Sequence, residues 1–316
     1  MDIFLPIVSL IIGIALLVWS ADEFTDSGAR IAKLFQISPL VIGLVIFGFG
    51  TSAPELLVTG VSSFEGNAGI GIGNAVGSNI FNIALVLAIS VIILPIHISK
   101  TTIKREWFFQ LIAVVIAGYV LLDNFISLID GVILASFFGL FLIYSFKTAK
   151  NTDMPKVEIG NKKDQSKVWL MLIFTLIVLM LSAKLVVWSG QTLAQSFGVP
   201  DLIIGLTLIA LGTSLPELAV SVSSAIKKQH EMLLGNILGS NLFNTLAVLS
   251  LPGLIRPTEV DREIMSRDYP VMLLVALLIV VLAYRRKGEY RLGKVSGIIF
   301  LVVLTLYLMM LVKDVL

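Results

Sequence analysis

Long apolar runs separated by short polar stretches make up almost the whole chain. Ten runs can be drawn, at about residues 3–20, 39–64, 71–95, 107–122, 128–146, 168–189, 201–226, 233–255, 269–284 and 292–312. Each is close to the roughly 20 residues that a helix needs to cross a bilayer. The pattern therefore predicts an all-α polytopic membrane protein with ten transmembrane helices.

One polar, lysine-rich stretch, residues 148–167, separates the first five runs from the last five. We expect it to be a linker between two halves, residues 1–147 and 168–316. Because five is odd, the second half enters the membrane from the side opposite to the first. This arrangement predicts an inverted-topology repeat, the architecture in which transporters place their site near the bilayer midplane.

The two halves also repeat each other in sequence at a constant offset of 162 residues, which separates Glu55 from Glu217. Nine of sixteen positions are identical between residues 40–55 and 202–217. The shared positions include Gly, Ser, Pro and Glu, which unrelated apolar segments would not place in register. The chain therefore contains an internal duplication.

Each half carries one motif with an acid inside an apolar run: GTSAPE at residues 50–55 and GTSLPE at residues 212–217. A charge at the bilayer centre costs roughly 2.5 to 3.5 kcal/mol on insertion scales, so such acids usually face a polar interior and mark an ion path. Glu55 and Glu217 are therefore candidate ligands of one shared site. Helical spacing places two hydroxyls beside each glutamate: Thr51 and Ser52 in the first motif, and Thr213 and Ser214 in the second.

A proline in each motif weakens the helix. Pro54 cannot donate a hydrogen bond to the carbonyl of Gly50. The same holds for Pro216 and Gly212. We expect helices 2 and 7 to be broken here, with free backbone carbonyls that line a cavity. The alternative is a proline kink that serves packing only, with each glutamate bonded to a neighbour.

The next run of each half begins with a polar stripe, GNAVGSNIFN at residues 73–82 and GNILGSNLFN at residues 235–244. Asn, Ser and Asn stand at i, i+4 and i+8 and so share one helix face. The favoured ligands are Ser78, Asn82, Ser240 and Asn244. For Asn74 and Asn236, a bond between helices is an equal alternative. The glycines of each stripe have the spacing that lets two helices approach closely.

The composition excludes several classes of protein and of metal site. With 57% hydrophobic residues, 14% charged residues and a mean hydropathy of +0.98, little of the chain is left for a soluble domain. The net charge of +2 is too small to argue for nucleic acid. The absence of cysteine excludes disulfides and thiolate metal sites. All candidate ligands are oxygens, which suit hard cations such as Ca²⁺ and Na⁺.

Basic residues indicate the orientation in the membrane. The side that carries the linker has 17 Lys and Arg residues in the predicted loops, and the other side has four. Because basic residues favour the cytoplasm, we expect the linker to be cytoplasmic and both termini to lie outside. The expected location is the plasma (inner) membrane, in a multi-pass arrangement.

The two acidic motifs, each followed about twenty residues later by a GN-xx-GSN-xx-N segment, resemble the alpha-repeats of the cation/calcium antiporter superfamily, in its sodium/calcium exchanger branch. The resemblance covers essentially the whole chain. It implies a fold of ten helices in an inverted repeat, in which the long first and sixth helices slide past the core to alternate access.

The resemblance also implies roles for individual residues. It assigns cation coordination to the two acids and the hydroxyls beside them: Glu55, Thr51, Ser52, Glu217, Thr213 and Ser214. It assigns the outer Na⁺ sites to Ser78 and Ser240, and Asn82 fits the family pattern. It adds the backbone carbonyls of Gly48 and Ala210, whereas the proline argument points to the motif glycines. The sequence leaves this choice open.

We therefore expect a secondary antiporter that exchanges Na⁺ for Ca²⁺ and holds no prosthetic group. Its expected partners are these ions and the lipid bilayer, without nucleic acid, and the expected state is a monomer. The nearest alternative is a proton-coupled or K⁺-dependent exchanger of the same fold. Asn244 argues against K⁺ because potassium-dependent relatives carry aspartate at this position. A passive channel is a further alternative.

An intramembrane enzyme with Ser52 or Ser214 as nucleophile is the alternative from another class. No histidine or lysine base stands in helical register with either serine. Catalytic sites are also rarely duplicated symmetrically. We therefore expect no enzyme.

Overall fold

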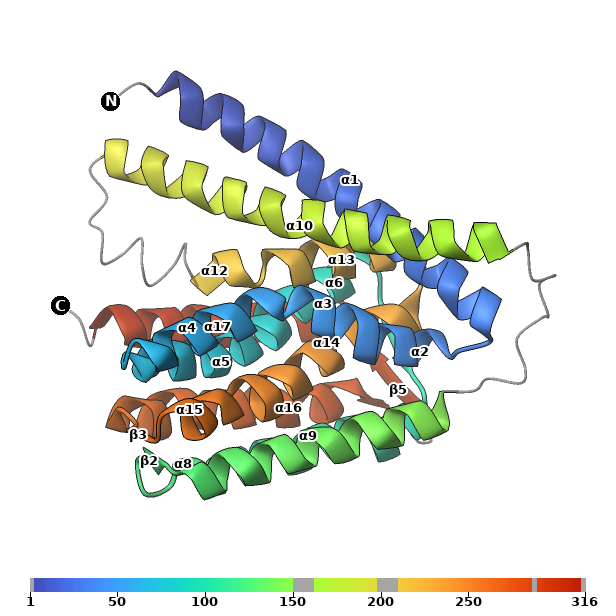
Figure 1. Ribbon diagram of the computed structural model, residues 1–316. Coiled ribbons are helices and arrows are strands. Elements are labelled where there is room, and N and C mark those ends of the chain that lie inside the picture. Colours follow the sequence, from blue (N-terminus) through green and yellow to red (C-terminus); the bar gives the residue numbers. More distant parts are fainter. Residues whose placement is uncertain (1–2, 150–161, 198–209, 286–288, 314–316) are drawn as a thin grey trace.

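The computed structural model describes residues 3–149, 162–197, 210–285 and 289–313 (Figure 1). Within these residues, seven helices are long and apolar enough to cross a membrane, or eight if one bent pair counts as a single span. The molecule is thus a helical protein of several membrane spans. This agrees with the expected fold class.

Helices account for most of the described chain, and several contain a π-helical turn, labelled η. In the first half they are α1 (Phe4–Phe35), α2 (Pro39–Val41), η1 (Ile42–Phe47), α3 (Gly48–Thr51), α4 (Ala53–Phe64), α5 (Ala68–Phe81), η2 (Asn82–Leu87), α6 (Ala88–Ile93), α7 (Lys100–Thr102), η3 (Ile103–Trp107), α8 (Phe108–Leu121) and α9 (Leu128–Thr148). In the second half they are α10 (Lys162–Ser196), α12 (Ala210–Thr213), α13 (Leu215–Ile226), α14 (His230–Leu242), η5 (Phe243–Val248), α15 (Ser250–Ile255), η6 (Ile264–Asp268), α16 (Tyr269–Ala283) and α17 (Lys294–Lys313).

Two short sheets, which the apolar pattern does not predict, lie at opposite ends of the molecule (Figure 1). One pairs β2 (Phe125–Ile126) with β3 (Thr258–Glu259). The other has the order β1-β5-β4, from β1 (Ile96–Ile98), β5 (Glu289–Leu292) and β4 (Tyr284–Arg285). Each sheet joins a strand of the first half to a strand of the second. We name the two ends of the molecule the β2–β3 end and the β1–β5 end.

Helices α1 and α10 lie side by side along one edge of the molecule (Figure 1). Both are longer than the apolar runs that predicted them, because each helix continues through polar residues. The two helices share a cluster of buried apolar side chains that includes Leu17, Phe24, Leu172 and Leu179. The same cluster also includes Phe47 of η1 and residues of α13 and α14, so the pair packs against the core through apolar side chains.

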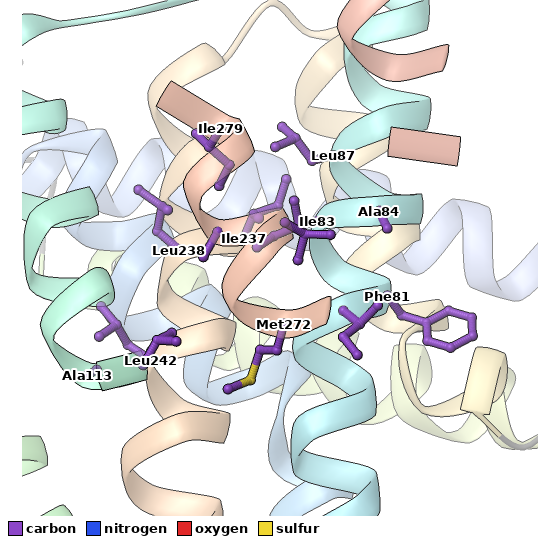
Figure 2. Close-up of a cluster of buried hydrophobic side chains, with 14 of the residues drawn as sticks. Phe81, Ile83, Ala84, Leu87, Ala113, Ile237, Leu238, Leu242, Met272 and Ile279 are labelled. Atoms are coloured by element: carbon purple, nitrogen blue, oxygen red, sulfur yellow. The ribbon is translucent and has the colours of Figure 1, made fainter. Parts of the chain in front are cut away.

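The other helices share a larger apolar core (Figure 2). It contains Ile83, Leu87, Ile237 and Leu242, all nearly inaccessible. The spans built from α5 with α6 and from α14 with α15 have 72% and 94% of their apolar windows buried, against 28% for α1. The two spans that carry the polar stripes are thus the innermost, so the stripes are not exposed to lipid.

Two hydrogen bonds cross between α8 and α16 in a reciprocal pattern. Trp107 donates its Nε1–H to the carbonyl of Ala276 at 2.9 Å. Tyr269 donates its hydroxyl to the carbonyl of Val114 at 3.2 Å. Donors and acceptors are each related by the offset of 162 residues. The duplication is therefore present in the contacts between the halves as well as in the sequence.

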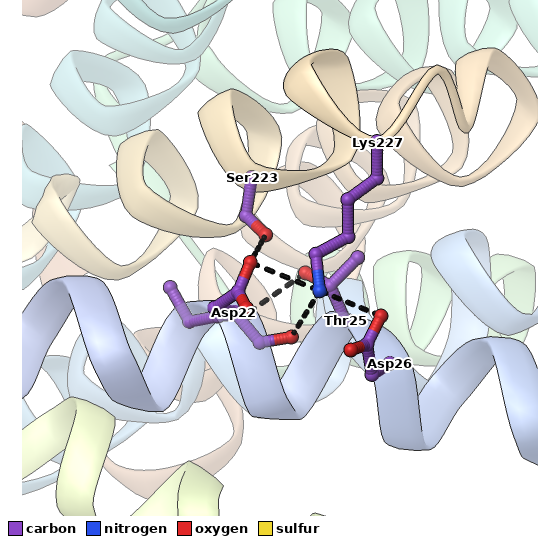
Figure 3. Close-up of polar contacts among 6 residues, drawn as sticks. Asp22, Thr25, Asp26, Ser223 and Lys227 are labelled. Carbon is purple, nitrogen blue, oxygen red and sulfur yellow. Dashed lines mark hydrogen bonds and ion pairs between the residues drawn. The ribbon is translucent and has the colours of Figure 1, made fainter.

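One ion-paired cluster ties α1 to the end of α13 (Figure 3). Lys227 Nζ lies 2.9 Å from Asp22 Oδ1 and 2.6 Å from Asp26 Oδ1, and Ser223 donates its hydroxyl to Asp22. Partial burial lowers the pKa of Lys227, but hydrogen bonds from the lysine to Asp26 and Asp22 outweigh this effect and raise it. The lysine therefore stays charged and links the outer pair of helices to the core.

Replacing Lys227 with glutamine should loosen α1 without unfolding the protein. The expected loss of stability is at most about 1 kcal/mol, because both carboxylates are partly exposed to solvent. The natural chain has no cysteine, so spin labels can be attached to cysteines introduced on α1 and α13. The measured distance distribution should broaden in Lys227→Gln. The matched control is Lys228→Gln at the exposed neighbouring position, and equal distributions in both variants would contradict the expectation.

Candidate cation-binding site

Both acidic motifs lie at breaks between two helices. Helices α3 and α4 meet at Ser52, and the span they form is bent by 44°. Helices α12 and α13 meet at Ser214, whose φ and ψ of −90° and 4° are close to the −86° and 8° of Ser52. The motif prolines stand in the first turn of α4 and α13, where a backbone N–H is not needed. The proline argument therefore located the breaks correctly within the described residues.

Glu55 and Glu217 occupy the first turns of α4 and α13, and both are completely buried. The free N–H groups of a helix start favour negative charge. Ser78 donates its hydroxyl to Glu55 Oε1 at 3.2 Å. Ser52 donates to Glu217 Oε1 at 3.3 Å. Since Ser52 belongs to the first half and Glu217 to the second, the two motifs meet in space.

Two further contacts between the halves are related by the repeat. The hydroxyls of Thr51 and Ser240 are 3.1 Å apart, and those of Ser78 and Thr213 are 3.4 Å apart. Thr51 is also within hydrogen-bonding distance of Asn236 Oδ1, at 3.3 Å. Hydroxyls of both halves thus meet in a polar layer beside the two glutamates.

The side-chain amide nitrogen of Asn236 makes hydrogen bonds between helices, which is the alternative that the sequence left open for this residue. Its Nδ2 donates to the hydroxyl of Ser221 at 2.9 Å and to the backbone carbonyl of Glu217 at 3.3 Å. These bonds hold α14 against α13. The repeat counterpart Asn74 has no partner for its Nδ2 within the described structure. The two halves therefore differ at this position.

Several buried polar atoms at the site have no hydrogen-bond partner among the described residues. They are Oε2 of Glu55, Oε2 of Glu217, Oγ of Ser214, and both amide atoms of Asn82 and of Asn244. Native proteins leave only a few such atoms per hundred residues, and each asks for an explanation such as an ion. The unpartnered atoms are mostly oxygens. Their chemistry fits a hard cation.

Asn82 and Asn244 lie in π-helical turns on opposite sides of the site. Asn82 begins η2, which packs against α13, and Asn244 lies in η5, which packs against α4. Each asparagine thus lies in a turn that packs against the helix bearing the glutamate of the other half. Such turns occur frequently at functional sites.

The backbone candidates lie in the same broken segments. Gly48 begins α3 and Ala210 begins α12. The carbonyl of Gly48 accepts a hydrogen bond from the backbone N–H of Ser52 at 3.2 Å. A carbonyl has a second lone pair, so the choice between these carbonyls and those of the motif glycines stays a prediction. The preceding part of the seventh apolar run, residues 201–209, lies outside the described residues.

The charge of the site comes from its two carboxylates. No place in the described ranges gathers three or more His, Cys, Asp or Glu side chains. Two carboxylates can neutralise one Ca²⁺, and neutral oxygens can complete its six to eight ligands. The arrangement can equally distribute its charge over several monovalent cations.

A cavity of about 300 Å³ connects the polar layer to the β2–β3 end. Ser78, Thr213 and Asn74 line its inner part, and Arg267 and Asp268 of η6 line the part near β3. Asp268 is only 4% exposed and lines the cavity.

The glycines of the two polar stripes have different surroundings. A methyl group on Gly77 would meet nothing within 4 Å. A methyl group on Gly239 would overlap the carbonyl of Leu44 in η1. The expected close helix approach is thus realised at α14 but not at Gly77 of α5. The site is sealed by backbone contact toward the β1–β5 end and is open toward the β2–β3 end.

Comparisons with known proteins agree with this description. Residues 5–147 and 167–313 match the family described as "Sodium/calcium exchanger protein". The chain is 39% identical over 302 residues to the "Putative antiporter CaxA" of Alkalimonas amylolytica, with 92% of this chain and 94% of that protein covered. It is 30% identical over 320 residues to the "Sodium/calcium exchanger MaX1" of Methanosarcina acetivorans, with 86% and 89% covered.

The fold also matches a solved structure. The sodium-calcium exchanger NCX_Mj, soaked with 10 mM Na⁺ and zero Ca²⁺, superposes with a TM-score of 0.84 at 31% sequence identity. The match covers 96% of this chain and 98% of that chain. A second structure of NCX_Mj, soaked with 2.5 mM Na⁺ and 0.1 mM Ca²⁺, gives a TM-score of 0.81.

The unequal glycine surroundings predict opposite effects of one substitution at two related positions. Gly239→Ala should lower stability by about 1 to 3 kcal/mol, because the new methyl overpacks the contact with Leu44. Gly77→Ala should leave stability unchanged or raise it by up to about 1 kcal/mol, because alanine favours the helix. Thermal unfolding in detergent, followed by size-exclusion chromatography, would measure both. Equal losses in the two variants would contradict the asymmetry.

Proposed function

Because this chain belongs to the sodium/calcium exchanger family, we propose that it is a secondary antiporter that exchanges Na⁺ for Ca²⁺ at the site between Glu55 and Glu217. The single observation that supports this most strongly is the set of buried, unpartnered oxygens around the two carboxylates. They offer hard-cation ligands from both halves in a setting from which water is largely excluded. An exchanger of this kind needs no catalytic residue and no prosthetic group.

The proposed ligands are the oxygens on which the two motifs and the two stripes converge. They are Glu55, Thr51, Ser52, Ser78, Asn82, Glu217, Thr213, Ser214, Ser240 and Asn244, with the carbonyls of Gly48 and Ala210. The same carboxylates serve either ion, so Ca²⁺ and Na⁺ compete. If three Na⁺ replace one Ca²⁺, each cycle moves one net charge and is driven by voltage as well as by the Na⁺ gradient.

We further propose that the chain has ten spans arranged as two inverted five-helix repeats, residues 1–147 and 168–316, around a cytoplasmic linker at 148–167. The reciprocal hydrogen bonds between α8 and α16 support this arrangement. The distribution of basic residues supports termini outside and a plasma-membrane location. Helix α9 begins just after β2 and ends at the linker. In this orientation, the β2–β3 end therefore faces outside.

These features fit an alternating-access mechanism, in which the site is open toward one end of the molecule while the other end is closed. The site is open toward the β2–β3 end and sealed toward the β1–β5 end. The α1 and α10 pair packs against η1 and α13 through apolar side chains, and the cluster at Lys227 also joins α1 to the end of α13. We propose that this pair moves across the core, closes the cavity toward the β2–β3 end and opens a related cavity toward the β1–β5 end.

Neutralising either glutamate should abolish exchange. In vesicles loaded with Na⁺, uptake of radioactive Ca²⁺ should depend on the outward Na⁺ gradient and fall to background in Glu55→Gln and in Glu217→Gln. The matched control is Glu65→Gln, at an exposed position just beyond α4, and it should transport normally. Uptake that ignores the Na⁺ gradient would refute sodium coupling. Uptake driven by a pH gradient alone would identify a proton-coupled exchanger instead.

Alternating access predicts that a methyl group added at Gly77, which meets nothing within 4 Å here, also slows exchange. In the opposite state, Gly77 would occupy the environment that Gly239 has now. Gly77→Ala should therefore bind Ca²⁺ normally but slow exchange by about tenfold, since a penalty of about 1.4 kcal/mol falls on one state only. Equilibrium binding and vesicle flux measured together would test this. Exchange at the wild-type rate would contradict the alternation.

A further inference from the structure

A charged pair that the proposed ligand set does not use stands in the outer cavity. Arg267 and Asp268, which we name the mouth pair, are joined by two contacts: Nε to Oδ1 at 2.8 Å and Nη2 to Oδ2 at 3.1 Å. Tyr307 of α17 donates its hydroxyl to Asp268 Oδ1 at 3.0 Å. Both carboxylate oxygens are thus bonded, and the pair is held in one geometry.

The position of the mouth pair gives it electrostatic influence over the site. Arg267, Asp268 and Tyr307 line the same cavity as Ser78 and Thr213. A cation that takes this route passes the guanidinium. Charges that line a cavity with apolar walls act more strongly on ions than charges in open water do. The positive charge of Arg267 repels cations here, and the negative charge of Asp268 reduces that repulsion.

The pair is duplicated, although its sequence pattern is short. Arg267-Asp268-Tyr269 stands 162 residues after Arg105-Glu106-Trp107. Both triplets lie where a π-helical turn, η6 or η3, meets the next helix. Glu106 is 8% exposed, and its Oε2 has no hydrogen-bond partner in the part of the chain that the structure describes. Arg105 and Glu106 are thus the sequence counterparts of the mouth pair in the first half.

We propose that the mouth pair sets the affinity for cations, and the preference for Ca²⁺ over Na⁺, on the β2–β3 side. The proposal rests on the proposed exchange function. The pair does not ligate the ion; it adjusts the potential of the cavity through which the ion reaches Glu55 and Glu217. Because electrostatic energy scales with ionic charge, the effect on Ca²⁺ is twice as large in free energy as the effect on Na⁺.

The alternative is that the pair only fastens η6 to α17. A fastening role predicts that removing either partner harms the protein in the same way. An electrostatic role predicts opposite signs, because Asp268→Asn leaves one positive charge in the cavity and Arg267→Gln leaves one negative charge. The double variant is neutral, like the wild type, and leaves no lone buried charge. The sign of the effect therefore separates the two roles.

The test measures apparent Michaelis constants for Ca²⁺ and Na⁺ from each face, in oriented vesicles. Asp268→Asn should raise the constant for Ca²⁺ on the β2–β3 side about tenfold and that for Na⁺ about threefold. A shift of about tenfold for Ca²⁺ corresponds to about threefold for Na⁺, because the interaction free energy with one unit charge is twice as large for the divalent ion. Arg267→Gln should lower both constants, and the double variant should return near wild type. Raised salt should shrink every shift by screening.

Two control variants separate the electrostatic role from other effects of the substitutions. Glu106→Gln, at the position related to Asp268 by the repeat, should leave the constants on the β2–β3 side unchanged. Tyr307→Phe keeps the charges and should shift either constant less than threefold. Shifts of the same sign in both single variants, or equal shifts for Ca²⁺ and Na⁺, would overturn the electrostatic role. Wild-type vesicles without Na⁺-driven Ca²⁺ flux would instead refute the proposed function, so the two failures are distinguishable.

Discussion

Two completely buried carboxylates are the constraint on which the rest of this structure depends. Glu55 and Glu217 lie where ionised groups are expensive, and each has only one carboxylate oxygen bonded to a protein hydroxyl. The helix breaks at Ser52 and Ser214 place the carboxylates at helix starts, which favour negative charge. The innermost spans turn their polar stripes toward the glutamates. A bound cation would complete this balance, which explains why so many oxygens converge and remain unpartnered.

The packing around this site divides into a rigid part and a part attached by weaker contacts. The reciprocal bonds of Trp107 and Tyr269 and the shared apolar core hold the inner helices together. Helices α1 and α10 share a second apolar cluster with η1 and α13, and solvent-accessible ion pairs also join α1 to α13. Such pairs contribute about 1 kcal/mol or less, so they can break and form within a functional cycle.

The sequence predicts which residues form the site better than it predicts toward which end of the molecule the site is open. The offset between Glu55 and Glu217 and the prolines beside them are enough to predict helix breaks and two acids brought together. Asp268 stands just before the apolar run at 269–284, and only its contact with Tyr307 of α17 shows that it lines a cavity. The duplicated glycines are identical in sequence, so no local signal tells which is open. The length of α1 likewise depends on a distant partner, Lys227, that periodicity does not detect.

The crossed bonds between α8 and α16 also bear on how the two halves could diverge. Each acceptor is a backbone carbonyl, of Ala276 or Val114, so neither bond requires a particular side chain in return. The donors already differ, since one is tryptophan and the other tyrosine. Either half can therefore accumulate substitutions without waiting for a compensating change in the other. A duplicated gene joined in this way can specialise its two membrane faces separately while its halves stay fastened.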